Sequence, residues 1–205
     1  MMLPEIVVRE SRIHGLGLFA TRYIPCGTVV WFPCRRCERW SATEVHRFRA
    51  PQVKWLDEYG YRLSGGGLLL PCSNAHLMNH SCESNVLDFH LDFAVAVRGI
   101  REDEEVTCDF RTFTDDPNWS LACRCAAPDC AGNITPQDGM DARLQRVWSR
   151  RMAEALTRLR DTPQPIEEEL LITSTVYRQM RSRESVLTDA DRTSIRRPAF
   201  LSGLC

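Results

Sequence analysis

The chain has 205 residues and a formal net charge of -1 at pH 7, a length that favours one compact domain with an appendage. Hydrophobic residues make up 43% and charged residues 26% of the chain, which excludes wholesale disorder, collagen and coiled coils. A charge so close to zero gives no support for direct nucleic-acid binding.

No segment is typical of a membrane helix or a secretion signal. The longest uncharged stretch, residues 63–82, is interrupted by glycines and Pro71, so it predicts no membrane span. The N-terminal residues MMLPEIVVRESR lack a basic start, an apolar core and a cleavage site, and we therefore expect a cytoplasmic protein. Ten cysteines in a reducing compartment favour metal ligation over disulfides.

Short β-branched runs separated by turn residues predict strands up to about residue 113, at residues 5–9, 27–32, 87–97 and 105–110. Between them, residues 43–59 carry apolar side chains at helical spacing around Pro51, which predicts one or two short inserted helices. The fold class expected for this part of the chain is mainly β with some α.

The pattern changes after Asp141. An amphipathic helix is predicted from apolar residues at helical spacing, namely Leu144, Val147, Trp148, Met152, Ala155, Leu156 and Leu159. A second helix is expected to begin near Pro165, with three glutamates in its first turn. Residues 189–205 are polar and arginine-rich, and we expect them to be poorly ordered or docked by Phe200 and Leu201.

Three cysteines within eight residues, Cys123, Cys125 and Cys130, lie in a polar loop that offers little interior for packed thiols. Zinc is the expected occupant, and structural zinc prefers four tetrahedral ligands. The candidates for the fourth ligand are Cys82, Cys108 and the Cys34/Cys37 pair. Chance clustering in a cysteine-rich chain is the alternative.

The Cys34-x-x-Cys37 pair has a spacing that is weak evidence by itself. Surface thiols, half of another zinc site and a redox pair are all compatible with it. The remaining cysteines, Cys26, Cys72 and Cys205, are expected to be small packing residues.

Two further segments have the composition of a ligand site. Residues 79–85, NHSCESN, form a dense polar run directly after apolar residues, where buried polar groups must be hydrogen-bonded. Residues 14–20, HGLGLFA, contain two glycines that permit close approach of the backbone to a ligand. Each is weak evidence alone, and a satisfied turn or an ordinary glycine loop explains either.

The order of these segments is more specific than any one of them. HGLGLFA, NHSCESN, GIREDEEVTCDF at residues 99–110 and the three-cysteine loop together resemble the SET-domain protein lysine methyltransferases over residues 5–135. The resemblance implies several small curved β-sheets around a pseudoknot. It implies a SET domain at residues 1–120 with an inserted helical segment at about 41–62, a post-SET zinc loop at 121–135 and a helical C-terminal extension at 136–205.

The resemblance also implies transfer of a methyl group from S-adenosylmethionine to a lysine ε-amine of a protein or peptide. Cys82 would complete a zinc site with the three loop cysteines. The residues implied to contact the cofactor are His14, Gly15, Leu16, Gly17, Tyr61, Asn79, His80, Trp119 and Leu121. Ile134 is an alternative to Trp119 and Leu121 for covering the adenine, and Tyr61 is equally compatible with a core aromatic.

The sequence departs from the family pattern at Phe110, where the family has a tyrosine whose hydroxyl helps to orient the reacting groups. Cys108 lies where the family commonly has a larger channel residue, which predicts room for multiple methylation. Three other functions stay open: an interaction module with impaired catalysis, a methyltransferase acting on a small amine, and a zinc-binding interaction domain that binds neither cofactor nor substrate. Residues 136–205 are expected to pack on the SET core, cover the substrate groove or form a dimer, and the sequence leaves the oligomeric state open.

Overall fold

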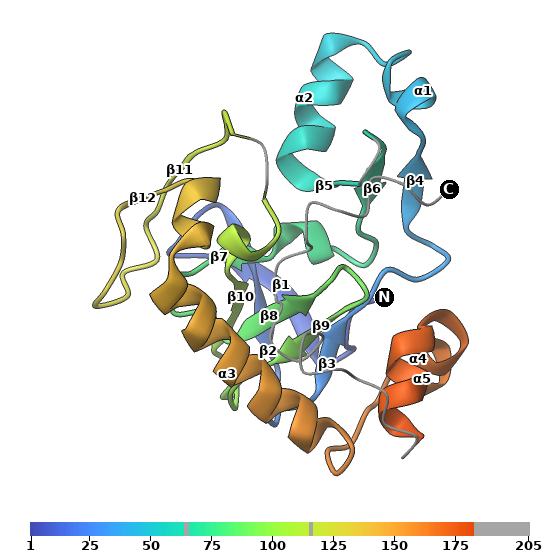
Figure 1. Ribbon diagram of the computed structural model, residues 1–205, viewed down its shortest axis with the longest axis vertical. Coiled ribbons are helices and arrows are strands. Elements are labelled where there is room, and N and C mark those ends of the chain that lie inside the picture. Colours follow the sequence, from blue (N-terminus) through green and yellow to red (C-terminus); the bar gives the residue numbers. More distant parts are fainter. Residues whose placement is uncertain (64–65, 115–116, 183–205) are drawn as a thin grey trace.

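The computed structural model describes residues 1–63, 66–114 and 117–182. Its centre is a seven-stranded sheet in which β10 (Glu105–Cys108) pairs with four-residue β8 (Val86–Phe89), with β2 (Leu16–Ala20) and with β7 (Asn79–His80). The path of the sheet runs β1-β2-β10-β8-β9-β3, where β1 is Ile6–Glu10, β9 is Phe93–Ala96 and β3 is Val29–Trp31 (Figure 1). Small sheets with few helices agree with the predicted fold class.

The expectation of one strand over residues 87–97 was wrong, because the chain reverses within it. Strands β8 and β9 form an antiparallel hairpin in which Phe89 pairs with Phe93. The turn places His90 and Leu91 at φ of 55° and 57°, a conformation that glycine or asparagine usually adopts. Because neither residue is a typical turn former, the alternation of apolar residues concealed the hairpin.

Residues 38–70 form an insert with its own three-stranded sheet in the order β4-β6-β5. Its elements are β4 (Glu38–Trp40), α1 (Ala42–Val45), α2 (Ala50–Tyr59), β5 (Tyr61–Arg62) and β6 (Leu68–Leu70). Pro51 lies in the first turn of α2, where its missing N–H is not needed, so the apolar run becomes two helices. The insert projects from the core sheet in Figure 1.

Three 3₁₀ turns and one small hairpin connect these parts: η1 (Ala75–Leu77), η2 (Phe110–Thr112), η3 (Pro136–Met140), and β11 (Leu121–Ala122) with β12 (Asn133–Ile134). The three-cysteine loop is the connection within that hairpin. Gly132, at φ 73°, helps the chain to turn back.

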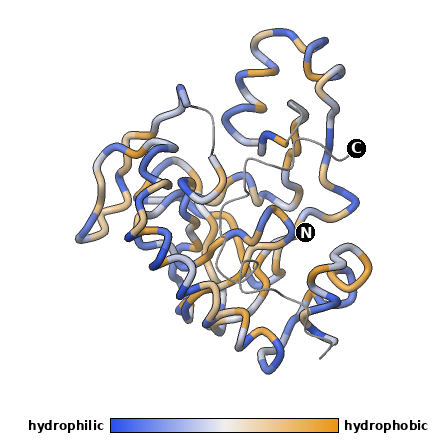
Figure 2. The backbone as a smooth tube through the Cα atoms, in the orientation of Figure 1, coloured by the Kyte–Doolittle hydropathy of each residue, from blue (hydrophilic) through white to orange (hydrophobic). Residues whose placement is uncertain are grey.

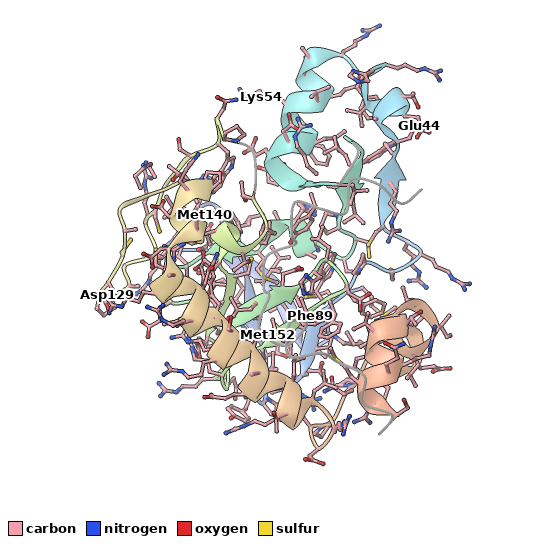
Figure 3. The ribbon with its side chains drawn as sticks, viewed as in Figure 1. Glu44, Lys54, Phe89, Asp129, Met140 and Met152 are labelled. Atoms are coloured by element: carbon pink, nitrogen blue, oxygen red, sulfur yellow. The ribbon has the colours of Figure 1, made fainter. Side chains whose placement is uncertain are left out.

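Helix α3 (Ala142–Leu159) begins at Asp141, whose side chain accepts a hydrogen bond from the Leu144 N–H. It packs on the core sheet through one buried stripe, Trp148, Met152, Ala155 and Leu159. Figure 3 shows Met152 on the side of α3 that faces the sheet, and Figure 2 shows apolar and polar residues alternating along this helix. Burying such side chains contributes roughly 1.5–3 kcal/mol each, apart from the smaller alanine. Packing on the core, covering a substrate groove and forming a dimer were the three roles expected for this segment. The buried stripe of α3 packs on the core.

Helices α4 (Glu167–Thr173) and α5 (Thr175–Arg181) continue along the β3 edge of the sheet. Gln164 joins this edge, since its side chain accepts from Val29 N–H at 2.9 Å and donates to the Gly27 carbonyl at 2.8 Å. No helix within the described residues is long and apolar enough to cross a membrane. The expectation for residues 189–205 lies outside the described residues.

Candidate active site

The amide of Asn79 joins three segments that are far apart in the sequence. Its Nδ2 donates to the carbonyl oxygens of His14 and Leu16, each at 3.1 Å, and to Glu105 Oε1 at 2.8 Å. Strand β7 sets this position, because Asn79 pairs with Thr107 in parallel register. The HGLG and NHSC segments therefore meet at the start of β10, and no residue in the described part of the chain hydrogen-bonds the Asn79 Oδ1 acceptor.

The two glycines of the HGLG segment have different physical roles. Gly15 has φ 47° and open space around the position of a Cβ, so it serves backbone conformation. A Cβ on Gly17 would lie 2.3 Å from Glu105 Oε1, so Gly17 serves close packing. Glu105 is held further by the Ser11 hydroxyl, which donates to its carboxylate at 2.8–2.9 Å. Sequence reasoning did not select Glu105 or Ser11.

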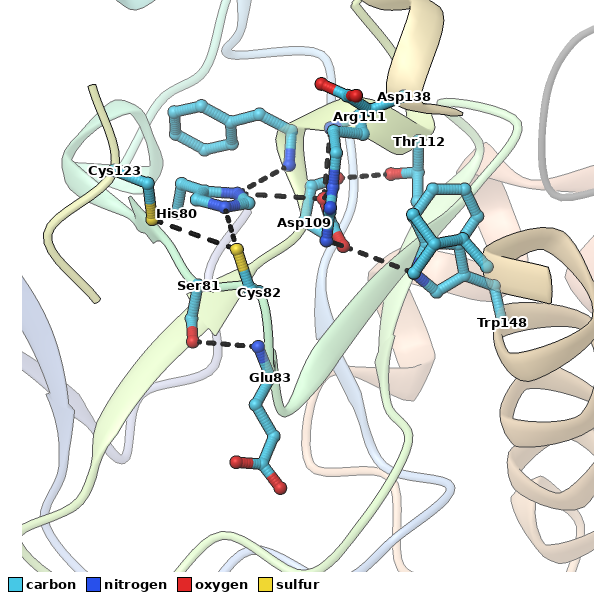
Figure 4. Close-up of polar contacts among 12 residues, drawn as sticks. His80, Ser81, Cys82, Glu83, Asp109, Arg111, Thr112, Cys123, Asp138 and Trp148 are labelled. Atoms are coloured by element: carbon cyan, nitrogen blue, oxygen red, sulfur yellow. Dashed lines mark hydrogen bonds and ion pairs between the residues drawn. The ribbon is translucent and has the colours of Figure 1, made fainter. Parts of the chain in front are cut away.

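His80 is a buried neutral imidazole that connects strand β7 to the end of β10. Its Nδ1 accepts the Phe110 N–H at 3.1 Å, so its proton resides on Nε2, which lies 3.5 Å from Cys82 Sγ (Figure 4). Burial lowers the pKa of His80 to about 4, since the attraction of Asp109 is weaker than the desolvation and Arg111 opposes the charge. The ring is thus fixed in one tautomer between Phe110 and Cys82.

A fully buried ion pair follows β10. Arg111 donates to both carboxylate oxygens of Asp109, at 2.9 and 2.7 Å, and the indole of Trp148 donates to Asp109 Oδ2 at 3.2 Å (Figure 4). The Arg111 guanidinium also lies 5.7 Å from the centroid of the Trp148 ring. This cluster, which sequence reasoning missed, fixes the backbone on both sides of Phe110. Its sequence signal was the charged Asp109–Arg111 pair around an apolar residue.

Phe110 lies in an aromatic cluster. Its ring centroid lies 5.5 Å from those of His80 and Phe113, and 6.4 Å from that of Trp119. Phe113 in turn lies 4.9 Å from Tyr61. Tyr61 also stacks on Trp31 at 5.7 Å, so it takes part in this cluster as a packed aromatic. The contacts of Tyr61 match the core-aromatic alternative. Its ring is linked to that of Phe110 through Phe113, which contacts both.

Cys108 is buried at the end of β10, in register with His80 on β7 and with Val86 on β8. Burial, together with the negative charges of Asp88 and Asp109, raises the pKa of its thiol well above the usual range. Cys108 therefore presents a small, uncharged S–H two residues before Phe110.

Four thiols meet beside this site. The Sγ atoms of Cys82, Cys123, Cys125 and Cys130 all lie within 4.8 Å of one another. Cys82 Sγ lies 3.9 Å from Cys123 Sγ, and the Cys82 N–H donates to Cys125 Sγ at 3.4 Å. Burial acts to raise the pKa of Cys125, but hydrogen bonds from the Cys82 and Ala127 N–H groups and from neighbouring thiols lower it to about 7. The donor set suits zinc, and of the fourth ligands considered, Cys82 is the one brought to the loop.

The residues expected to cover an adenine lie around the same loop. Trp119 is half-buried beside Phe110, and Leu121 pairs with the fully buried Ile134 across the β11–β12 hairpin. The second cysteine pair, Cys34/Cys37, gains a third thiol. Cys72 Sγ lies 3.5 Å from Cys34 Sγ, so treating Cys72 only as a packing residue missed this cluster.

Known proteins that are similar to this chain include several histone-lysine N-methyltransferases. A family profile described as the SET domain matches residues 15–111. Histone-lysine N-methyltransferase trr of Drosophila melanogaster is 28% identical over 138 residues, covering 62% of this chain and 6% of that protein. Histone-lysine N-methyltransferase ATX2 of Arabidopsis thaliana is 41% identical over 137 residues, covering 61% of this chain and 12% of that protein.

Among solved structures, the methyltransferase domain of human Histone-lysine N-methyltransferase SETMAR aligns with a TM-score of 0.47 at 22% identity. The alignment covers 63% of this chain and 57% of that chain. The chain spans only a small part of the curated relatives, 14% of their length or less.

Proposed function

The chain belongs to the SET-domain lysine methyltransferase family, and we propose that it transfers a methyl group from S-adenosylmethionine to a lysine ε-amine of a protein. The observation that carries the proposal is the position of Asn79, whose amide joins the HGLG segment to β10. Three segments that the family uses for its cofactor thereby meet at one place. The proposed division is a SET domain at residues 1–120, a post-SET loop at 121–135 and an extension at 136–205.

The residues present fit the cofactor. Asn79 Oδ1 accepts from none of the described residues and would accept from an ammonium group, while Nδ2 donates to carbonyl and carboxylate oxygens. Gly17 has no side chain where one would collide with Glu105, so the backbone of residues 14–17 lies close to Asn79. We assign the methionine part of the cofactor to this backbone and to Asn79, and the adenine to His80, Trp119 and Leu121.

S-adenosylmethionine supplies an electrophilic methyl group on a sulfonium. The chain must then keep the lysine amine in its neutral form, orient it toward the methyl group and exclude water from it. The aromatic cluster around Phe110 and the protonated Cys108 thiol offer apolar surroundings, which favour the neutral form of an amine. The small Cys108 side chain leaves room for successive methyl groups.

Four cysteine thiols beside His80 support zinc as a second component of the site. Cys82, Cys123, Cys125 and Cys130 would hold the ion, which would fix the β11–β12 loop against the segment that carries Asn79 and His80. The His80 Nε2–H would donate to the Cys82 sulfur, a contact that orients a metal ligand.

One observation favours a second candidate, an interaction module without turnover. Phe110 keeps a ring at the end of β10 but carries no hydroxyl. If one hydrogen bond in the transition state is missing, the rate falls by about 10²–10³ by analogy with the loss of an oxyanion-hole donor.

The test measures binding and turnover separately. Calorimetry with S-adenosylmethionine reports binding, and release of S-adenosylhomocysteine is assayed on a pool of lysine peptides that includes histone tails, since the relatives are named histone-lysine N-methyltransferases. Lys54, exposed on α2, is the only lysine, so Lys54→Arg removes self-methylation of a lysine from the background (Figure 3).

Turnover by Lys54→Arg would support the enzyme. Binding without turnover, with activity appearing in the Phe110→Tyr variant, would favour the interaction module. Absence of binding by zinc-loaded protein would contradict both.

A further inference from the structure

We propose that Cys34, Cys37 and Cys72 form a second thiolate site for a divalent zinc-like ion, which fastens the two ends of the insert to the core. Their three Sγ atoms lie within 4.8 Å of one another. Cys72 Sγ lies 3.5 Å from Cys34 Sγ and 3.6 Å from Cys37 Sγ. This site is separate from the four-thiol cluster and plays no part in the proposed methyl transfer.

The two separations from Cys72 Sγ are close to those between the sulfurs of a zinc–thiolate site. With Zn–S bonds of about 2.3 Å at tetrahedral angles, sulfur atoms lie about 3.8 Å apart. The Cys82–Cys123 separation of 3.9 Å in the four-thiol cluster and the 3.5–3.6 Å separations here are both close to this value. A disulfide needs about 2.05 Å and would leave one of three thiols unpaired, so an odd number of adjacent cysteines favours a metal.

The loop that carries Cys34 and Cys37 is held in place before any ion binds. The Arg39 guanidinium donates to the carbonyl oxygens of Pro33, Cys34 and Cys37 at 3.2–3.4 Å. The Arg36 N–H donates to Cys34 Sγ at 3.4 Å, and Cys37 N–H donates to the Cys34 carbonyl at 3.1 Å. Of these donors, the Arg36 N–H reaches a sulfur and would stabilise the Cys34 thiolate, which is the form that binds metal.

The three cysteines flank the insert in the chain, and this explains how an ion bound to them would fasten it. Cys34 and Cys37 precede β4, where the chain enters the insert, and Cys72 follows β6, where the chain returns to the core. In Figure 1 β4 and β6 lie side by side, as their antiparallel pairing requires. An ion held by all three sulfurs would close the loop of residues 38–70 and remove conformational freedom from the unfolded chain.

The closed segment is connected to two residues of the candidate site, Tyr61 and Asn79. Tyr61 is on β5 of the insert and contacts Trp31 and Phe113 of the core, and Cys72 leads through η1 to Asn79. Among the described residues no further His, Cys, Asp or Glu joins the group, so the fourth metal position is left to water or an external ligand.

The test is a metal count on the full chain, which does not depend on turnover. Protein purified with zinc is measured by native mass spectrometry and by elemental analysis. We expect two zinc ions per wild-type chain, one in Cys34→Ser/Cys37→Ser and one in Cys123→Ser/Cys125→Ser. The matched control is Cys26→Ser, a half-buried thiol outside both groups, and it should keep two ions.

If the cysteine variants fail to fold, titration of the wild-type chain with cobalt gives an independent count of the metal sites. Sulfur-to-cobalt charge-transfer bands of the wild-type chain should saturate at two equivalents of cobalt, with intensity for seven thiolates. Saturation at one equivalent, with intensity for four thiolates, would overturn the proposal. So would one zinc in wild-type protein that Cys34→Ser/Cys37→Ser retains, or a Cys34–Cys72 disulfide found by peptide mapping under non-reducing conditions.

Metal binding at this site should also slow hydrogen exchange in the insert. Hydrogen exchange of the β4 and β6 amides should accelerate in Cys34→Ser/Cys37→Ser and remain as in wild type in the Cys26→Ser control. Unchanged protection of β4 and β6 after loss of the second ion would contradict the fastening role.

Discussion

The indole N–H of Trp148 donates to Asp109 Oδ2 at 3.2 Å, and this bond ties the C-terminal helix α3 to the residue preceding Phe110. The other bonds to that carboxylate come from Arg111, so a residue from outside the segment that matches the SET profile completes a buried ion pair. A buried charge is tolerated only when its hydrogen bonds are complete, so α3 supports the end of β10 as well as covering the sheet.

The Trp148→Phe substitution keeps the apolar packing of α3 and removes this donor. We expect the free energy of unfolding to fall by about 1.5–3 kcal/mol, the range for a hydrogen bond to a charged group. Urea unfolding monitored by circular dichroism measures it. The matched control is Trp55→Phe, whose side chain is 46% exposed on α2 and which should change stability by at most about 0.5 kcal/mol. Equal midpoints for Trp148→Phe and wild type would show that the bond contributes nothing.

Gly17→Ala tests the cofactor site. The added Cβ would lie 2.3 Å from Glu105 Oε1, and the displaced carboxylate would no longer accept from Asn79. We expect the affinity for S-adenosylmethionine to fall about tenfold or more, equivalent to about 1.4 kcal/mol, with the fold retained. Calorimetry measures the affinity.

The control for this variant is Gly66→Asn, in the insert and outside the residues assigned to the cofactor. Gly66 has φ 83°, in the left-handed region that asparagine tolerates, and the nearest atom to an added Cβ is Ala42 Cβ at 3.4 Å. Affinity should change much less than in Gly17→Ala. Equal losses in the two variants would indicate a general disturbance of the fold instead of the predicted collision.

Tyr61→Phe tests whether the chain replaces the hydroxyl that Phe110 lacks. Tyr61 is joined to Phe110 through Phe113, and burial, followed by the proximity of Cys108 and the charge of Asp88, raises its pKa well above the usual range. Its hydroxyl therefore stays protonated as a donor. We expect kcat to fall about tenfold in the Lys54→Arg background, with affinity for S-adenosylmethionine unchanged.

Two comparisons separate this role from simple packing. Tyr59→Phe, on the insert beside Trp55 and His76, should leave kcat unchanged. Adding Phe110→Tyr to Tyr61→Phe should restore turnover, because either hydroxyl would supply the donor. If Tyr61→Phe retains full kcat, another group provides the function.

Local patterns predicted the elements, whereas contacts between distant residues escaped prediction. The stripe from Trp148 to Leu159 has a helical period, and α3 follows it. The partner of Trp148 lies 39 residues earlier in the chain, and a period along one helix carries no information about that contact. Cys72 was missed for the same reason, since 35 residues separate it from Cys37 and the antiparallel pairing of β4 with β6 brings them together.

The site residues show the same division. The NHSC and HGLG segments could be selected because polar and glycine-rich runs are locally unusual, and the structure brings Asn79 to His14 and Leu16. Glu105 lay in an ordinary acidic run, and only the pairing of β10 with β2 and β7 places its carboxylate beside Asn79.

Asp92 gives a prediction about pH. It lies in the β8–β9 turn and accepts from the Ser174 hydroxyl at the start of α5, and burial raises its pKa although the Ser174 bond opposes the shift. Because the folded pKa lies above the unfolded one, the protonated carboxyl stabilises the fold below the unfolded pKa, and this contribution is lost as pH rises through the folded pKa. At neutral pH the ionised carboxylate therefore costs stability.

Asp92→Asn removes the charge and keeps a carbonyl acceptor for Ser174. The variant should be more stable than wild type in urea at neutral pH, and the difference should shrink as pH falls through the folded pKa of Asp92, since the wild-type carboxyl then becomes neutral as well. The matched control is Asp161→Asn, an exposed position between α3 and α4 that should show no such convergence. A variant less stable than wild type at neutral pH, or a difference that stays constant with pH, would mean that the charge of Asp92 is compensated in the fold.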